Sequence, residues 1–300
     1  RTEPITESNV VSSDWRTIFC MMSGDTASGQ ETYRYGAAED SNKFDICRDA
    51  ASPCGIRGVS WHKGRMTNHP EPHQFSHVTD WVFDLDNTLY PHHTNLFSQI
   101  DVRMTAYVSD LLKLPREDAR KLQKELYLEY GTTLAGLMAR HGINSDDFLQ
   151  KVHDIDYTWL KPDEALGDAI KAVPGRKFIL TNGSRSHAER TANQLGILDH
   201  FDDIFDIVAA GLTPKPARET YDKFLTLHEV AGPNAVMFED LARNLIAPKA
   251  LGMKTVLVVP RNFEPTFAEI WERDAAQDDD VDYVTDDLTA FLRTIAPAAG

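Results

Sequence analysis

The chain has 300 residues, 42% of them hydrophobic, and a formal net charge of -15 at pH 7. This length is enough for one large domain, or for a core with a smaller partner domain, and it can bury a substantial interior. The negative charge excludes a general affinity for nucleic-acid polymers and for anionic membranes, because both need a basic surface. No apolar run approaches the roughly 20 residues that a membrane span requires, so we expect a cytoplasmic protein.

The first 75 residues differ in composition from the rest of the chain. Residues 1–75 are rich in Ser, Gly, Asp, Asn and Pro and show no useful periodicity, which predicts a disordered or irregular extension rather than a small folded domain. Cys20, Cys47 and Cys54 all lie in this segment. A disulfide within it stays open, whereas the remainder of the chain has neither disulfides nor thiolate metal ligands.

From residue 77 onward, short apolar runs alternate with helical patterns. The runs are WVF at 81–83, KFIL at 177–180, DIVAAG at 206–211, AVMF at 235–238 and KTVLVV at 254–259. This alternation predicts an α/β fold with a parallel sheet that is covered by helices on both faces. Gly252 is placed to end the helix before the fifth run in the left-handed conformation. The acidic stretch at 272–283 is predicted as a solvated loop, with weak Ca²⁺ binding as an open alternative.

About 85 residues between the first and second runs carry no strand signal. Apolar residues recur there at the spacing of amphipathic helices: Ile100, Met104, Tyr107, Val108, Leu111, Leu112, Leu122, Leu126 and Tyr130. We therefore predict a helical domain at 92–171. It is inserted into a core that is made of residues 77–91 and 172–297.

Polar residues follow directly after four of the predicted strands. They are Asp84, Asp86 and Thr88 after the first strand, Thr181, Asn182 and Gly183 after the second, Lys215 after the third, and Glu239 and Asp240 after the fourth. Ligands bind beyond the carboxyl ends of the strands in doubly wound sheets. Each motif alone is also typical of a turn, a helix cap or a surface side chain. Their shared position after the strands favours one joint site.

The acidic residues suit the hydrolysis of a phosphate ester. Asp84 can attack phosphorus and form an aspartyl-phosphate. Asp86 can give a proton to the leaving group and later take one from water, which favours a raised pKa. Mg²⁺ prefers oxygen ligands, and Asp84, Asp240 and the backbone carbonyl of Asp86 would hold it, with Glu239 close by.

Donors for the phosphoryl oxygens come from the other two motifs. The Thr181 hydroxyl, the Asn182 amide and the Lys215 ammonium can stabilise the charge that develops on the phosphoryl group. Pro214 and Pro216 restrict the loop that carries Lys215.

The motifs DLDNT, TNG, Lys215 and FEDLARN together resemble those of the haloacid dehalogenase-like superfamily, over about residues 77 to 297. The resemblance implies a Rossmann-like three-layer α/β sandwich and Mg²⁺-dependent hydrolysis of phosphomonoesters through an aspartyl-phosphate. The helical insert resembles the cap domain that one large class of the superfamily carries at this point. Such caps close over the site and screen substrates.

Several longer segments are similar to the pyrimidine 5′-nucleotidase branch: DNTLYP (86–91), YGTTLAGL (130–137), KPDEAL (161–166), TNGSRSHAERTANQLGI (181–197) and FEDLARNL (238–245). This similarity implies a nucleoside monophosphate such as UMP or CMP as the substrate. The candidates for substrate contact are Leu85, Thr88, Tyr90, Asn182, Gly183, Tyr130 and Thr132, with His92, His93 and Thr133 beside them. His187 and Arg185, in the helix after TNG, are expected to pack or to contact solvent, although Arg185 could also reach the substrate.

Two other functions stay open. The same core could hydrolyse or transfer the phosphoryl group of a sugar phosphate or another small phosphometabolite. A regulator that binds such a metabolite without turnover would keep the fold and lose catalysis. Halide removal is disfavoured, because it needs no metal and would not need Asp240.

Overall fold

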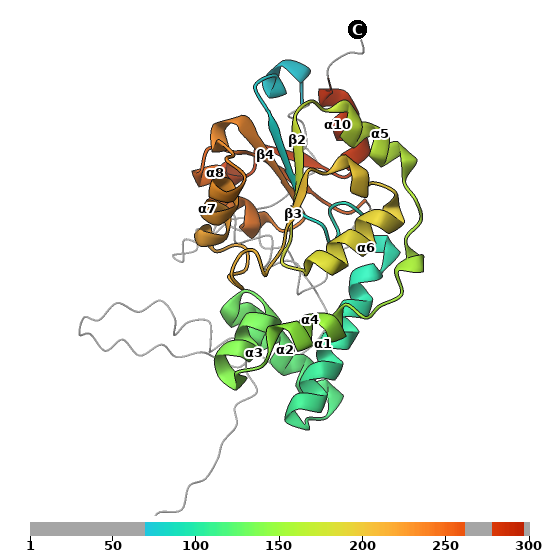
Figure 1. Ribbon diagram of the computed structural model, residues 1–300, viewed down its shortest axis with the longest axis vertical. Helices are drawn as coiled ribbons and strands as arrows, with labels where there is room; N and C mark the ends of the chain where they lie inside the picture. The colour runs from blue at the N-terminus through green and yellow to red at the C-terminus, as the bar shows by residue number, and fades with distance from the viewer. Residues whose placement is uncertain (1–69, 262–277, 297–300) are drawn as a thin grey trace, which may run out of the picture. The chain divides into compact units, whose positions relative to one another are not determined.

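The computed structural model describes residues 70–261 and 278–296 (Figure 1). The three cysteines and residues 1–69 of the expected extension lie outside these ranges. Within the described ranges, no helix combines the length and the apolar character that crossing a membrane demands. Phe75, which the prediction places in the extension, is 3% exposed and packs with Trp81 and Phe291. The described core therefore begins at or before this residue.

The strands form one parallel sheet, as the alternation of apolar runs and helical patterns predicts. They are β1 (Asp80–Phe83), β2 (Arg176–Leu180), β3 (Asp203–Phe205), β4 (Ala235–Glu239), β5 (Lys254–Val258) and β6 (Tyr283–Thr285). Their order across the sheet is β3-β2-β1-β4-β5-β6, and every neighbouring pair is parallel. This order puts β1 at the centre, between β2 and β4. Residues that follow these three strands therefore meet at one edge of the sheet.

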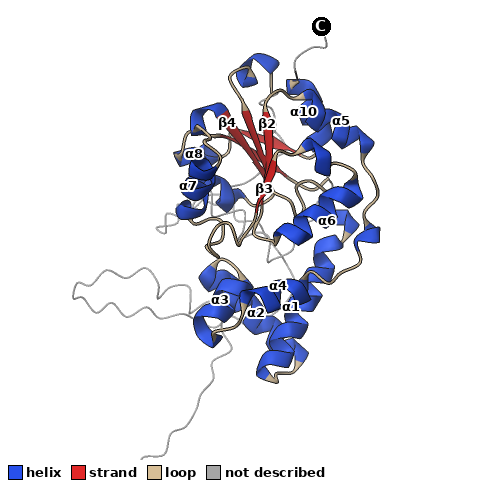
Figure 2. Ribbon diagram, in the orientation of Figure 1, coloured by secondary structure: helices blue, strands red, loops and turns tan. Residues whose placement is uncertain are grey.

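Helices cover both faces of the sheet (Figure 2). Helices α5 (Glu164–Ala172), α6 (Arg185–Leu195) and α10 (Leu288–Ile295) pack on one face, and α7 (Arg218–Leu227) and α8 (Ile246–Ala250) pack on the other. Successive strand residues alternate between the two cores: Phe83 joins the first cluster and Val82 the second. This alternation follows from the two-residue repeat of a strand and explains why the strands read as continuous apolar runs.

The third and sixth strands differ from the sequence prediction. The third strand is Asp203–Phe205 rather than 206–211, because Asp206 turns the chain. Its carboxylate accepts from the backbone N–H of Ala209 at 2.9 Å and of Arg185 at 2.8 Å. Residues 272–277 of the acidic stretch lie outside the described ranges. Tyr283, the last residue of that stretch, is buried and begins β6, a strand that was not predicted. The prediction for Gly252 is confirmed, since its φ is +85°.

The insert after β1 is helical. It contains α1 (Leu96–Leu112), α2 (Arg116–Tyr130), α3 (Thr133–His141) and α4 (Ser145–Val152). Their apolar faces share a cluster that includes Ile100, Leu126, Leu137 and Phe148, and Ile207 after β3 also belongs to it. Helix α5 lies within the range assigned to the cap, yet Leu166, Ala169 and Ile170 on it pack in the cluster of the sheet. We use "cap" below for α1–α4.

Candidate active site at the carboxyl ends of the strands

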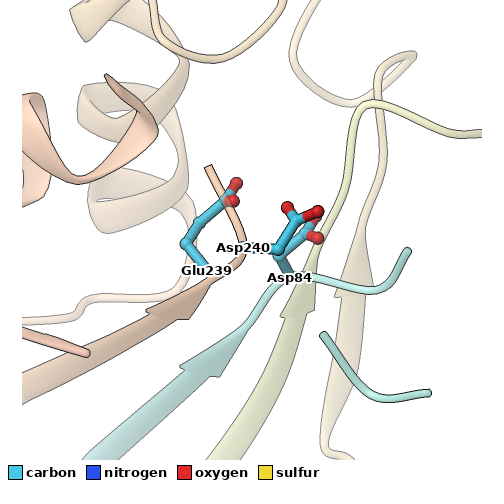
Figure 3. Close-up of side chains that lie close together, drawn as sticks. All are labelled: Asp84, Glu239 and Asp240. Carbon is cyan, nitrogen blue, oxygen red and sulfur yellow. The ribbon is translucent and has the colours of Figure 1, made fainter. Parts of the chain in front are cut away.

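Three carboxylates meet where β1 and β4 end. Asp84 follows β1 directly, Glu239 is the last residue of β4, and Asp240 is the next residue (Figure 3). One oxygen of each lies within 4.8 Å of the others. The register Phe83 with Phe238 brings these residues side by side, because paired positions on neighbouring parallel strands are adjacent. The joint site that the sequence predicts is thus assembled at one sheet edge.

Lys215 lies between two of these carboxylates. Its Nζ donates to Asp84 Oδ1 at 2.6 Å, to Glu239 Oε1 at 2.7 Å and to the carbonyl oxygen of Leu180 at 3.0 Å. The ammonium group has three protons, so all of them are used in this arrangement. The Lys215 side chain is 2% exposed. Here Lys215 holds the carboxylates together, and it would reach a phosphoryl oxygen only by exchanging one of these bonds.

The charges at this edge do not balance. Burial raises the pKa of Asp84 to about 7, Lys215 opposes that rise, and the charges of Glu239 and Asp86 add to it. Burial and the charges of Glu239 and Asp84 also raise the pKa of Asp240 well above its ordinary value. Three crowded carboxylates therefore lie beside a single lysine. Their oxygens are the ligands that Mg²⁺ prefers, and their excess negative charge favours a bound cation.

The three carboxylates have different surroundings. Glu239 is fully buried, and besides Lys215 it accepts from Asn244 Nδ2 at 2.7 Å and from the Leu241 N–H at 2.9 Å. These donors, with the lysine, lower the pKa of Glu239 although burial alone would raise it. Asp84 and Asp240 are thus the better candidates for direct metal contact. Glu239 primarily orients Lys215.

The TNG turn contacts the loop that carries Lys215. Asn182 accepts from the Lys215 N–H at 2.8 Å and donates to the Lys215 carbonyl oxygen at 3.2 Å, so its amide joins the two motifs. Thr181 Oγ1 accepts from the Gly183 N–H at 2.9 Å, which leaves the hydroxyl proton as a donor for a ligand. Asn182 Nδ2 uses one of its two protons on the Lys215 carbonyl oxygen. The predicted phosphoryl donors that stay available in this arrangement are therefore the Thr181 hydroxyl and the second Asn182 proton.

Asp86 has surroundings that the sequence analysis missed. Its Oδ1 accepts from the Tyr90 hydroxyl at 2.5 Å and lies 2.9 Å from Nε2 of His187. Burial alone would raise the pKa of Asp86, but His187 and Tyr90 together lower it. The expected raised pKa is therefore wrong for this arrangement, because both donors favour the ionised carboxylate. His187 is fully buried, which is the packing alternative of the two that the sequence left open.

A cavity of about 500 Å³ joins this edge of the sheet to the cap. All four catalytic candidates and both acids after β4 line it, and so do Asn182, Gly183, Thr132, Thr133 and His92. Other residues proposed for substrate contact do not line it: Leu85, Thr88 and Tyr90 are buried, and Tyr130 packs against the apolar residues shared by the cap helices.

The cap side of the cavity carries a charged group that the sequence analysis did not identify. Asp101 on α1 accepts from Arg120 at 2.7 Å, from Gln123 at 2.7 Å and from Lys124 at 2.8 Å. All four line the cavity, beside apolar Met104 and other cap side chains. The signal was present in the sequence, since an acid interrupts the apolar pattern of α1, and residues 120, 123 and 124 share one face of α2. We call these four residues the cap cluster.

Comparison with known proteins agrees with this geometry. Residues 82–252 match the family model described as haloacid dehalogenase-like hydrolase. "Phosphate metabolism protein 8" of Saccharomyces cerevisiae is 31% identical over 136 residues, which cover 41% of this chain and 42% of that protein. The match thus spans less than half of that relative.

Solved structures show the same fold. L-2-haloacid dehalogenase from Xanthobacter autotrophicus, both free and with chloropropionic acid covalently bound, superimposes with a TM-score of 0.50 at 16% identity. In both cases the superposition covers 74% of this chain and 100% of the dehalogenase. At this identity the likeness concerns the fold alone. The family match covers more than half of the chain and includes the strands that carry Asp84, Thr181 and Glu239, so the chain belongs to the haloacid dehalogenase-like hydrolases.

Proposed function

We propose that this hydrolase cleaves phosphomonoesters with the help of Mg²⁺, and that pyrimidine nucleoside 5′-monophosphates such as UMP or CMP are its substrates. The observation that carries the reaction class is the meeting of Asp84, Glu239 and Asp240 around Lys215 at the mouth of the cavity. Asp240 gives this site a second carboxylate beside the nucleophile, which a phosphoryl group needs and a halide does not.

The proposed reaction has two displacements at phosphorus. A carboxylate oxygen of Asp84 bonds to phosphorus, the bond to the ester oxygen breaks, and that oxygen takes a proton from Asp86. Asp86 enters this step in its protonated form, although Tyr90 and His187 favour the ionised carboxylate. A water oxygen then bonds to phosphorus and gives a proton to Asp86, while the bond to Asp84 breaks. Thr181 donates to a phosphoryl oxygen throughout.

Asp84 and Asp240 would hold Mg²⁺, with the backbone carbonyl of Asp86. When bound, the ion offsets the repulsion between the carboxylates and the phosphoryl dianion. Lys215 keeps Asp84 and Glu239 at fixed positions in the same region. Preorganised charges of this kind act strongly because the surroundings exclude water.

The choice of a nucleotide rests on the cavity and on the sequence resemblance. A cavity of about 500 Å³ falls in the range of small-ligand sites. Its cap side offers apolar contacts from Ile100, Met104 and Phe148 for a base and polar contacts from the cap cluster for its edge. The chain is also similar to a yeast protein whose name refers to phosphate metabolism, which supports the same reaction class.

Two measurements on the purified protein test the reaction class and the substrate: phosphate release from phosphate esters, and chloride release from 2-chloropropionate. The panel contains UMP, CMP, AMP, ribose 5-phosphate, glucose 6-phosphate and 2-chloropropionate, each with Mg²⁺ and with EDTA, and Asp84→Asn is the control for contaminating phosphatase. We expect release from UMP and CMP that EDTA abolishes. Faster phosphate release from a sugar phosphate would show that the substrate is a sugar phosphate and not a nucleotide. Chloride release would show that the reaction is dehalogenation. Binding of a phosphometabolite without any release would indicate a metabolite-binding regulator.

A further inference from the structure

Two buried side chains hold one oxygen of Asp86 and leave the other untouched. The Tyr90 hydroxyl donates to Oδ1 at 2.5 Å, and Nε2 of His187 lies 2.9 Å from the same atom. Tyr90 is 1% exposed and His187 is fully buried. Neither lines the cavity, whereas Asp86 does. Among the described residues, Oδ2 has no hydrogen-bond partner, so it is the oxygen that is available to a ligand.

His187 is itself fixed on its far side. Its Nδ1 lies 2.9 Å from the Tyr157 hydroxyl, which also lies 3.1 Å from the carbonyl oxygen of His153. The His153 ring stacks on the His187 ring, with 4.4 Å between centroids and 6° between planes. Both ring nitrogens of His187 thus have polar partners, and these contacts fix the orientation of the ring.

The proton of Nε2 follows from these contacts. If Tyr157 donates to Nδ1, a neutral His187 carries its proton on Nε2. In that arrangement His187 donates to Oδ1 of Asp86.

We propose that Tyr90 and His187 are positioning residues for proton transfer: they hold Oδ1 of Asp86 so that Oδ2 faces the cavity and exchanges the proton with the leaving group. This assignment rests on the proposed phosphomonoester hydrolysis. Neither residue touches the substrate, and both act through the orientation of one carboxylate. Proton transfer is sensitive to such orientation because the carboxyl group must lie within hydrogen-bond reach of the ester oxygen.

Dependence on the leaving group separates this role from a purely structural one. The ratio kcat/KM reports the steps up to release of the leaving group. Nitrophenolate leaves without a proton, whereas the ribose oxygen of UMP needs one. A misoriented Asp86 therefore lowers kcat/KM for UMP and leaves kcat/KM for para-nitrophenyl phosphate nearly unchanged. A general loss of fold lowers both equally.

The variants are Tyr90→Phe, which removes only the hydroxyl, His187→Leu, which removes the donor, and His187→Gln, which keeps an N–H near the position of Nε2. Tyr107→Phe is the matched control, since that hydroxyl donates to Asp147 in the cap at 3.1 Å, outside the cavity. Melting temperatures and circular dichroism check that each variant is folded.

We expect Tyr90→Phe and His187→Leu to lower kcat/KM for UMP about 10- to 100-fold and for para-nitrophenyl phosphate less than about 3-fold. His187→Gln should recover much of the loss, and Tyr107→Phe should match the wild type. Equal losses on both substrates, or wild-type kinetics for Tyr90→Phe, would overturn the assignment. If the wild-type protein hydrolyses para-nitrophenyl phosphate but not UMP, the proposed nucleotide substrate is wrong. The comparison is then repeated with an alkyl phosphate that the wild-type protein hydrolyses in place of UMP. Wild-type protein inactive on the whole panel overturns the proposed function and this assignment with it.

Discussion

The two ends of the cavity handle charge in different ways. At the sheet end, Asp84, Lys215 and Glu239 are almost fully buried, and Lys215 donates to both carboxylates. At the cap end, Asp101 is bonded to Arg120 and Lys124, whose side chains are 56% and 46% exposed. The first arrangement is costly unless each group is paired, whereas the second is screened by water.

This difference separates the two tasks of the site. Buried and fixed charges suit a reaction in which charge develops at one place, because they need no reorganisation. Partly exposed charges on a helix can adjust, which suits contact with the variable part of a substrate. We therefore expect substitutions at the sheet end to change turnover and stability, and substitutions at the cap end to change selectivity.

The largest effect is expected for Asp84→Asn. An amide cannot replace the attacking oxygen, so turnover should fall by at least about 10³-fold. In EDTA the variant should melt at or above the wild-type temperature, because one of three crowded carboxylates has lost its charge. Phosphate release and thermal melts check both statements.

Asp80 at the opposite end of β1 provides the control. Its carboxylate pairs with Arg176 at 2.6 Å and is equally buried. Asp80→Asn should keep activity and lose about 1–3 kcal/mol of unfolding free energy, since it removes a balanced pair. Near-normal turnover of Asp84→Asn would show that the nucleophile is misassigned.

Lys215→Met should rank second. Its removal leaves Asp84 and Glu239 buried without their cation, which should cost about 3–5 kcal/mol of unfolding free energy in EDTA. Mg²⁺ should restore part of that stability, because a ligand that binds only the folded state stabilises it. Turnover should fall about 10²- to 10³-fold.

The measurements are chemical denaturation with and without Mg²⁺ and steady-state phosphate release. Lys223→Met is the matched control, because that ammonium group donates to the Ala210 carbonyl oxygen outside the cavity at 2.6 Å. A Lys215→Met protein as stable in EDTA as the control would contradict the role of the lysine as the partner of two carboxylates.

The sheet end was largely predictable from the sequence, because local patterns determine it. An apolar run followed by an acid marks the carboxyl end of a strand, and parallel pairing brings such ends together. Strand β3 was misplaced since the run at 206–211 is longer than Asp203–Phe205, and the turn at Asp206 depends on the distant Arg185 N–H. Tertiary contacts here overrode local preference.

The partners of the site residues were not predictable in the same way. Asp86 and His187 lie 101 residues apart, and Asp84 and Lys215 lie 131 residues apart. Only the fold shows that Lys215 uses its three donors on protein oxygens, or that Asn182 joins two loops. Tyr90 beside the first motif was predicted to contact the substrate, and it instead contacts Asp86 from beneath.

The smallest effect is expected at the cap end. The double variant Arg120→Gln and Lys124→Gln removes both cations from Asp101. It should raise KM for UMP about 10-fold, since two lost polar contacts at about 0.7 kcal/mol each cost about 1.4 kcal/mol together. The KM of para-nitrophenyl phosphate and the kcat of both substrates should change less than about 2-fold. Unfolding free energy should change by less than about 1 kcal/mol, because exposed ion pairs contribute little. Lys121→Gln, which removes an ion pair with Glu117 on the same helix but off the cavity, is the control. If KM rises equally for both substrates, the cap cluster acts on the phosphoryl end, and the division of tasks between the two ends fails.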